Sequence, residues 1–194
     1  MDWIWILIGT VGGAAAMFVW LGLAWMALPH HNGDFRGIPE PEGLDAVLDK
    51  LDSGGAFYCY PFMKDYPGGQ NDPDLKARLE KGPNAMITML PRGDFMGGGV
   101  FLRGFLLNLF DAFGLAMLCT LVAADVPGLT DKVALCAVVG AFLGVSSYGG
   151  MSNWMFIPWR FTWMSVFDRV IGFALIGLVL HFCLPGVSEV VPGG

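Results

Sequence analysis

The amino-acid sequence predicts an all-α membrane bundle of four transmembrane helices, with a small α+β cap inserted outside the membrane. Three observations predict this class. Of the 194 residues, 55% are hydrophobic and only 14% are charged, whereas about 45–50% and about 25% are usual in soluble domains. Four apolar runs approach or exceed the roughly 20 residues that a spanning helix needs. One polar segment, between the first two runs, holds most of the charge.

The first transmembrane helix is predicted within residues 1–28. Trp3–Leu28 is a run of 26 residues without a charged side chain. Pro29 follows and ends it, because proline cannot continue a helix. The run is longer than the core of a signal peptide and lacks the basic start of one, so we expect it to be retained.

Residues 29–99 are predicted to form the extramembrane α+β cap. Seven of the eleven basic residues lie between Arg36 and Arg92, and eleven of the seventeen acidic residues lie between Asp34 and Asp94. Apolar residues at helical spacing predict a helix at 41–52, and aromatic or branched runs predict strands at 56–62 and 84–90. Asp72 and Pro73 are typical of a helix start, and Gly82–Pro83 of its end. The order of these elements predicts one βαβ unit.

Residues 100–186 are predicted to hold the other three transmembrane helices. Their apolar runs cover 100–124, 133–148 (with a start near 129) and 166–184, and Pro127–Gly128 predicts a turn after the first of them. Residues 153–163 carry three tryptophans and predict an interfacial aromatic elbow, in which Trp159, Arg160 and Trp163 lie at the headgroup level. Residues 187–194 are a C-terminal tail.

Basic residues near the predicted spans predict the orientation. Five arginines border the side of the cap, whereas Lys132 alone borders the other side; the five are Arg36, Arg92, Arg103, Arg160 and Arg169. We therefore expect a multi-pass protein of the bacterial inner membrane, with the cap in the cytoplasm and both termini outside.

Two pairs of glycines are candidates for helix packing. Gly9 and Gly13 in the first helix, and Gly140 and Gly144 in the third, have the GxxxG spacing that lets membrane helices approach closely. Both helices run in the same direction and both pairs lie at similar depth, so we expect these two helices to touch. The alternative is that glycine is simply common in membrane helices.

Asp111 is the most costly residue within a predicted span, because a carboxylate at mid-depth costs about 2.5–3.5 kcal/mol on insertion scales. Asn108 lies three residues earlier on the same helix face. One interpretation is a proton or ion site. The favoured one is structural: a hydrogen bond to Ser146, Ser147 or Tyr148, or a contact with a partner subunit.

The histidines predict no metal site. His30 and His31 lie at the inner end of the first helix and His181 lies near the outer end of the fourth, separated by most of a roughly 30 Å hydrocarbon core. A bis-histidine site is therefore not expected, although a single axial ligand to a pigment or haem stays open. A polar collar that binds lipid headgroups or docks the cap is expected on the inner side; its members are His30, His31, Arg36, Arg160, Asp168 and Arg169.

Three short motifs resemble those of small bacterial inner-membrane proteins with four helices and no assigned activity. They are WLGLAWMALPHH at residues 20–31, GP at 82–83, and the WR pair before the last helix. The resemblance implies the four-helix architecture and implies no chemistry.

The function predicted from these features is that of an accessory, non-catalytic subunit in a larger bacterial membrane complex of respiratory or photosynthetic type. The net charge of −6 speaks against nucleic acid as a partner, and we find no GxSxG, HExxH or Walker motif and assign no catalytic residue. The expected partners are lipids and other membrane subunits, with contacts to lipid, quinone or pigment. The alternatives are a small proton- or ion-coupled transporter centred on Asp111, and a lipid-acting enzyme at the His30/Arg160 collar.

Overall fold

A computed structural model describes residues 3–39, 41–51, 57–63, 68–93, 96–123 and 125–184. The structure is mostly helical, at 71%, and the described residues include one small sheet of two strands. The chain divides into two compact units: Met1–Arg36 with Gly98–Gly194, and Gly37–Gly97. The first unit thus includes residues 29–36, which the sequence assigns to the cap. The predicted tail at 187–194 lies outside the described residues.

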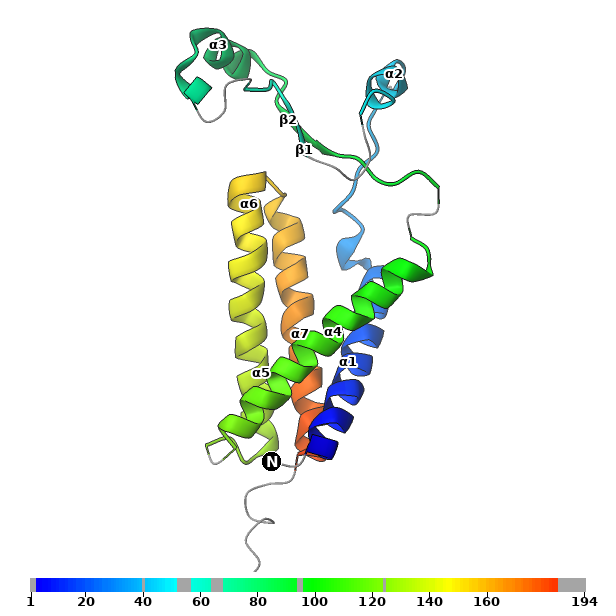
Figure 1. Cartoon of the computed structure of the whole chain (residues 1–194), viewed down its shortest axis with the longest axis vertical. Helices are drawn as coiled ribbons and strands as arrows, with labels where there is room; N and C mark the ends of the chain where they lie inside the picture. Colours follow the sequence, from blue (N-terminus) through cyan, green and yellow to red (C-terminus); the bar gives the residue numbers. More distant parts are fainter. Residues whose placement is uncertain are drawn as a thin grey trace, which may run out of the picture. The chain divides into compact units, whose positions relative to one another are not determined.

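Four helices of the first unit are long and apolar enough to cross a membrane (Figure 1). The first two are α1 (Trp3–Met26) and α4 (Gly98–Leu121). The third candidate span covers Leu129–Met155, and the fourth is α7 (Trp159–Cys183). Even a 24-residue helix rises about 36 Å, which exceeds the roughly 30 Å hydrocarbon core. Consecutive spans run in opposite directions, so the protein has the architecture of a multi-pass membrane protein.

The third span is longer than its apolar run indicates. It begins with α5 (Leu129–Gly144), passes through a single π-helical turn, η3 (Val145–Gly149), and ends with α6 (Gly150–Met155). The serines and glycines of this stretch lower its hydropathy without breaking the helix. The chain breaks only around Phe156, which has a positive φ of 55°, and Pro158, which precedes α7. The predicted elbow at 153–163 is therefore helical at both ends and irregular only in the middle.

α7 lies at the centre of the first unit, and α1, α4 and α5 pack against it. The core between these helices is mostly aliphatic, with Ile6, Met17, Leu115, Phe173, Ile176 and Leu180 among its buried residues. α4 runs obliquely across α1 in Figure 1. α7 is therefore the element through which the other spans are held together.

The predicted packing glycines face α7 rather than one another. A Cβ atom on Gly13 would lie 3.0 Å from Cγ2 of Ile176, and one on Gly140 would lie 2.9 Å from Cβ of Phe173. Gly9 and Gly144 likewise lie against α7. The expectation that the first and third helices touch through these glycines is thus wrong, because α7 fills the space between them and each pair brings its own helix close to α7.

The second unit holds one helical turn, α2 (Leu44–Leu48), and a two-stranded sheet of β1 (Phe57–Tyr60) and β2 (Ala85–Thr88). A 3₁₀ turn, η2 (Gly68–Asn71), and α3 (Pro73–Lys81) connect the strands. As predicted, Asp72 caps α3 by accepting the N–H of Asp74, and Gly82 ends it.

The two strands pair antiparallel, with Phe57 opposite Thr88 and Tyr60 opposite Ala85. The predicted βαβ unit, which requires parallel strands, is therefore wrong. A parallel crossover needs a helix with an apolar face that covers the sheet. Only Leu75 is buried in the largely charged α3, so the connection reverses the chain without covering the strands.

Candidate functional site

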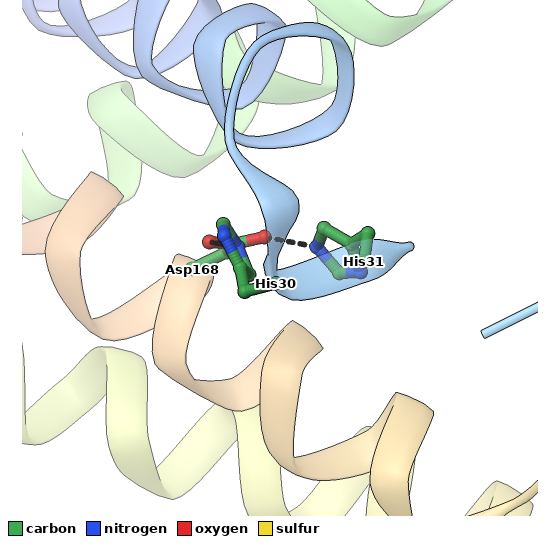
Figure 2. Close-up of side chains that lie close together, drawn as sticks. All are labelled: His30, His31 and Asp168. Carbon is green, nitrogen blue, oxygen red and sulfur yellow. Dashed lines mark hydrogen bonds and ion pairs between the residues drawn. The ribbon is translucent and has the colours of Figure 1, made fainter. Parts of the chain in front are cut away.

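The polar side chains of the first unit gather where α1 ends against α7. α1 stops at Met26, and Pro29 begins a single 3₁₀ turn, η1 (Pro29–His31). Proline is favoured at such a start because it has no N–H to leave unpaired. The turn directs the rings of His30 and His31 towards Asp168 on α7 (Figure 2).

Asp168 binds both histidines with one carboxylate. Its Oδ1 lies 3.0 Å from Nε2 of His30, and its Oδ2 lies 2.7 Å from Nε2 of His31. Asp168 and His31 are only 2% and 6% exposed, whereas the side chain of His30 is 19% exposed. A buried carboxylate requires partners of this kind, because an isolated charge is strongly destabilised away from water.

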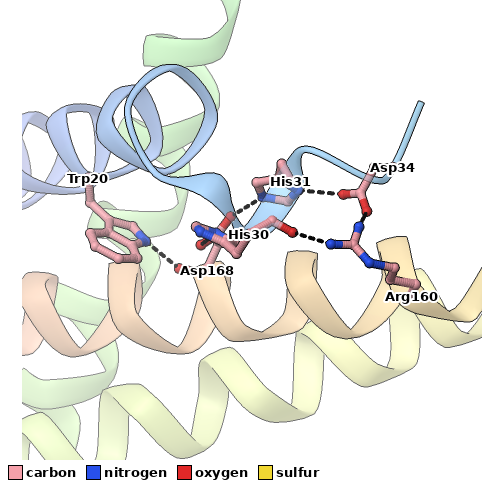
Figure 3. A network of polar contacts seen from close by, with 6 residues as sticks. All are labelled: Trp20, His30, His31, Asp34, Arg160 and Asp168. Atoms are coloured by element: carbon pink, nitrogen blue, oxygen red, sulfur yellow. Dashed lines mark hydrogen bonds and ion pairs between the residues drawn. The ribbon is translucent and has the colours of Figure 1, made fainter. Parts of the chain in front are cut away.

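A second carboxylate contacts the other ring nitrogen of His31 (Figure 3). Oδ2 of Asp34 lies 2.5 Å from Nδ1 of His31, and the side chain of Asp34 is fully buried. Arg160, in the first turn of α7, donates to Oδ1 of Asp34 and to the backbone carbonyl of His30. Gly33 allows this approach, since a Cβ atom there would lie 3.1 Å from the guanidinium carbon.

Two tryptophans of α1 enclose the same cluster. The ring of Trp25 stacks on His31 with centroids 3.8 Å apart and planes within 9°. The indole N–H of Trp20 donates to the backbone carbonyl of Asp168 over 3.1 Å. The rings shield the charged groups from competing water, which strengthens the ion pairs.

His31 has a carboxylate at each of its two ring nitrogens. A neutral imidazole has one N–H donor and one acceptor nitrogen, yet both ring nitrogens of His31 face carboxylate oxygens. With neutral histidines, Asp34 and Asp168 carry two negative charges against the single positive charge of Arg160. Both contacts of His31 become favourable only when a further cation is present, either an additional proton or a metal ion.

His30, His31 and Asp168 are the residues that could hold a metal ion. Among the described residues they form the only group of three or more His, Cys, Asp or Glu side chains whose ligand atoms all lie within 4.8 Å of one another. They offer two imidazole nitrogens and a carboxylate oxygen. The sequence predicts no bis-histidine site when His30 or His31 is paired with the distant His181. In the structure the two histidines that come together are the adjacent His30 and His31.

Asp111 lies in a different contact. Its Oδ2 accepts a hydrogen bond from Nη1 of Arg169 over 3.3 Å, so α4 is tied to α7. The guanidinium also lies over the rings of Tyr148 and Phe173. The expected hydrogen bond to Ser146, Ser147 or Tyr148 is thus replaced by an ion pair with Arg169. Asn108 is buried on the same helix, and its Nδ2 has no partner in the part of the chain that the structure describes.

The remaining predicted site residues stand apart from the cluster. Trp159 and Trp163 stack on each other at 6.1 Å, and both are about half exposed on α7. His181 lies in the last turn of α7, beside Phe182. A pocket of about 280 Å³ lies in the second unit beside α2 and includes none of the predicted site residues.

The sequence predicts part of this cluster. The collar places His30, His31, Arg160 and Asp168 on one side, and the structure brings these four together. Arg169 turns away to Asp111, because neighbouring residues on a helix point about 100° apart. Sequence reasoning missed Asp34, although its spacing of three residues after His31, across Asn32 and Gly33, is typical of a turn.

No known protein family, curated protein or solved structure matches this chain. The function is therefore inferred from the geometry of the helical unit and its polar contacts.

Proposed function

We propose that this protein is an accessory, non-catalytic subunit of a larger bacterial membrane complex of respiratory or photosynthetic type. The observation that supports the proposal is that polar and charged side chains join two other parts of the helical unit to α7. Asp111 and Arg169 join α4 to α7, and the contacts of Asp168 join the end of α1 to α7. Such contacts stabilise the packing of the helices, which is the role expected of an accessory subunit.

The ion pair of Asp111 also weighs against the transporter alternative. A carboxylate that carries protons or ions across a membrane must be accessible to them, whereas Oδ2 of Asp111 is bound to the Arg169 guanidinium on the neighbouring helix.

The outer surface of the helices supports a role among lipids and other subunits. Large apolar side chains are exposed on every span, among them Leu7, Leu107, Phe110, Phe142 and Phe182. In a bilayer these faces contact acyl chains or neighbouring helices, and helix association there depends on close packing. The proposal includes contacts of these faces with quinone or pigment. It also includes an orientation in the bacterial inner membrane, with the second unit in the cytoplasm and both termini outside.

Native electrophoresis of gently solubilised membranes tests the proposal. The full-length chain, produced from its own gene with a small affinity tag, should migrate in a large band and copurify with a constant set of membrane proteins. A matched sample in a harsh detergent should release it as a small species. A lone small species under the gentle conditions, with no constant partner, would overturn the accessory role.

A further inference from the structure

We propose that His30, His31 and Asp168 form a binding site for a divalent transition-metal ion. The site would lie where η1 meets α7, at the end of the helical unit that includes the start of α7. This inference goes beyond the accessory role and is tested separately from it, because a metal ion can be bound whether or not the protein has partner subunits.

The spacing of the donor atoms fits a single ion. Nε2 of His30 and Nε2 of His31 lie 3.0 and 2.7 Å from the two oxygens of Asp168, and one ligand atom from each residue lies within 4.8 Å of the others. Zinc-type bonds of about 2.0–2.1 Å place tetrahedral ligands about 3.3 Å apart. The three side chains therefore need only small rotations to surround an ion.

The residues that surround the donor atoms have the arrangement that is usual around a bound metal ion. A histidine that binds a metal through one nitrogen usually donates its other N–H to a carboxylate, which fixes the ring and raises its basicity. Asp34 holds this position at Nδ1 of His31, and Arg160 in turn holds Asp34. In the tautomer whose Nδ1–H donates to Asp34, Nε2 of His31 presents a lone pair towards Asp168.

The charge of the cluster favours a cation at this point. A lone pair on Nε2 of His31 that faces Oδ2 of Asp168 is repulsive. Of the two buried carboxylates, Asp34 binds the Arg160 guanidinium, whereas Asp168 faces the two histidines. A divalent ion between the nitrogen and the oxygen removes the repulsion, and it changes the summed charge of the two carboxylates and the guanidinium from −1 to +1. The competing explanation is a proton on His31, which would make the cluster a purely structural ion-pair network.

The donor set restricts the class of ion. Two imidazoles and one carboxylate suit Zn²⁺, Fe²⁺ or Mn²⁺. Mg²⁺ and Ca²⁺ prefer oxygen ligands, and Cu⁺ prefers thiolate or thioether sulfur. Three protein ligands leave a coordination position open for water or another small ligand.

Zinc binding by the full-length protein in detergent tests the site directly. The protein is purified with a histidine-free tag, stripped with a chelator and dialysed against micromolar Zn²⁺. We expect about one bound ion per chain, as for a single three-ligand site. His31→Ala and Asp168→Ala should lose it, whereas His181→Ala, a matched histidine outside the cluster, should keep it.

Two further measurements keep the test decisive if the ligand variants fold poorly. Asp34→Asn keeps all three ligands and should weaken Zn²⁺ affinity about 10–100-fold with unchanged stoichiometry. The Co²⁺-loaded wild-type protein should show the visible spectrum of nitrogen and oxygen ligands. Absence of Zn²⁺ from the wild-type protein, its retention by His31→Ala, or a thiolate spectrum from Cys119 and Cys136 would each overturn the proposal.

Discussion

Asp168 and Arg169 are neighbours in the sequence but make their contacts on different sides of α7. Asp168 faces the turn after α1, where it binds two histidines. Arg169 faces α4, where it binds Asp111. One Asp–Arg dipeptide thus places a negative and a positive charge in two separate contacts, and each charge is matched by a residue from a different span.

Removal of one member of the Asp111–Arg169 pair should destabilise the helical unit. Asp111→Asn leaves the guanidinium with a weaker partner, and an unpaired buried polar group costs about 1–3 kcal/mol. The double variant Asp111→Leu/Arg169→Met removes both charges and keeps the apolar volume, so it should unfold within about 1 kcal/mol of the wild type. Thermal unfolding in detergent measures all three proteins.

The transporter alternative predicts a different pattern for the same variants. In that case Asp111→Asn would keep wild-type stability and abolish a proton-linked flux. A double variant less stable than Asp111→Asn would also contradict the structural interpretation of the pair.

The residues of the cluster could be predicted only in part. Predicted topology is sufficient to place His30, His31, Arg160 and Asp168 on one side of the membrane. It does not give the direction of a side chain after a helix ends, and that direction depends on the 3₁₀ turn that Pro29 begins. Asp34 was missed for this reason, and the two adjacent histidines were not recognised as a pair that meets one carboxylate.

Close backbone contact is the common feature of the interfaces of α7 with α1 and α5. Gly13, Gly140 and Gly177 all lie where a Cβ atom would come within about 3 Å of an atom of a neighbouring helix. Small residues allow such approach in membranes, where apolar surface alone gives no preference for protein over lipid. The glycines therefore determine which helices can be adjacent.

Gly140→Ala should weaken the packing of α5 on α7. The added methyl group would lie 2.9 Å from Phe173 Cβ and 3.0 Å from the carbonyl oxygen of Arg169, and overpacking of this kind costs about 1–3 kcal/mol. Gly114→Ala is the matched control, because nothing lies within 4 Å of its added Cβ. Thermal unfolding should separate the two variants, and equal melting temperatures would contradict the packing described.

The four spans could be predicted because a long apolar run is visible directly in the sequence. The contacts between the spans, and the residues at which they end, could not be predicted. The third span extends to Met155 through serines and glycines that interrupt its hydropathy but not its backbone hydrogen bonds. The antiparallel pairing of β1 and β2 could not be predicted either, because two four-residue strands do not specify their relative direction.

The orientation of the whole protein can be measured with a native cysteine. Cys59 is exposed on β1, whereas Cys119 and Cys136 are buried between helices. If the second unit is cytoplasmic, a membrane-impermeant maleimide should label Cys59 in inverted vesicles and not in intact spheroplasts. Cys59→Ser is the control that removes this label, and labelling of Cys59 in spheroplasts would reverse the proposed orientation.

The contact between η1 and α7 has a consequence for how the protein is made. His30 and Asp168 are 138 residues apart in the chain, and ribosomes synthesise the chain from its N-terminus. The first span therefore enters the membrane long before the carboxylate that secures it exists. A nascent chain that stalls before α7 contains both histidines and Asp34 but lacks Asp168 and Arg160, their partners on that helix. The cluster therefore forms only when translation has supplied the final span.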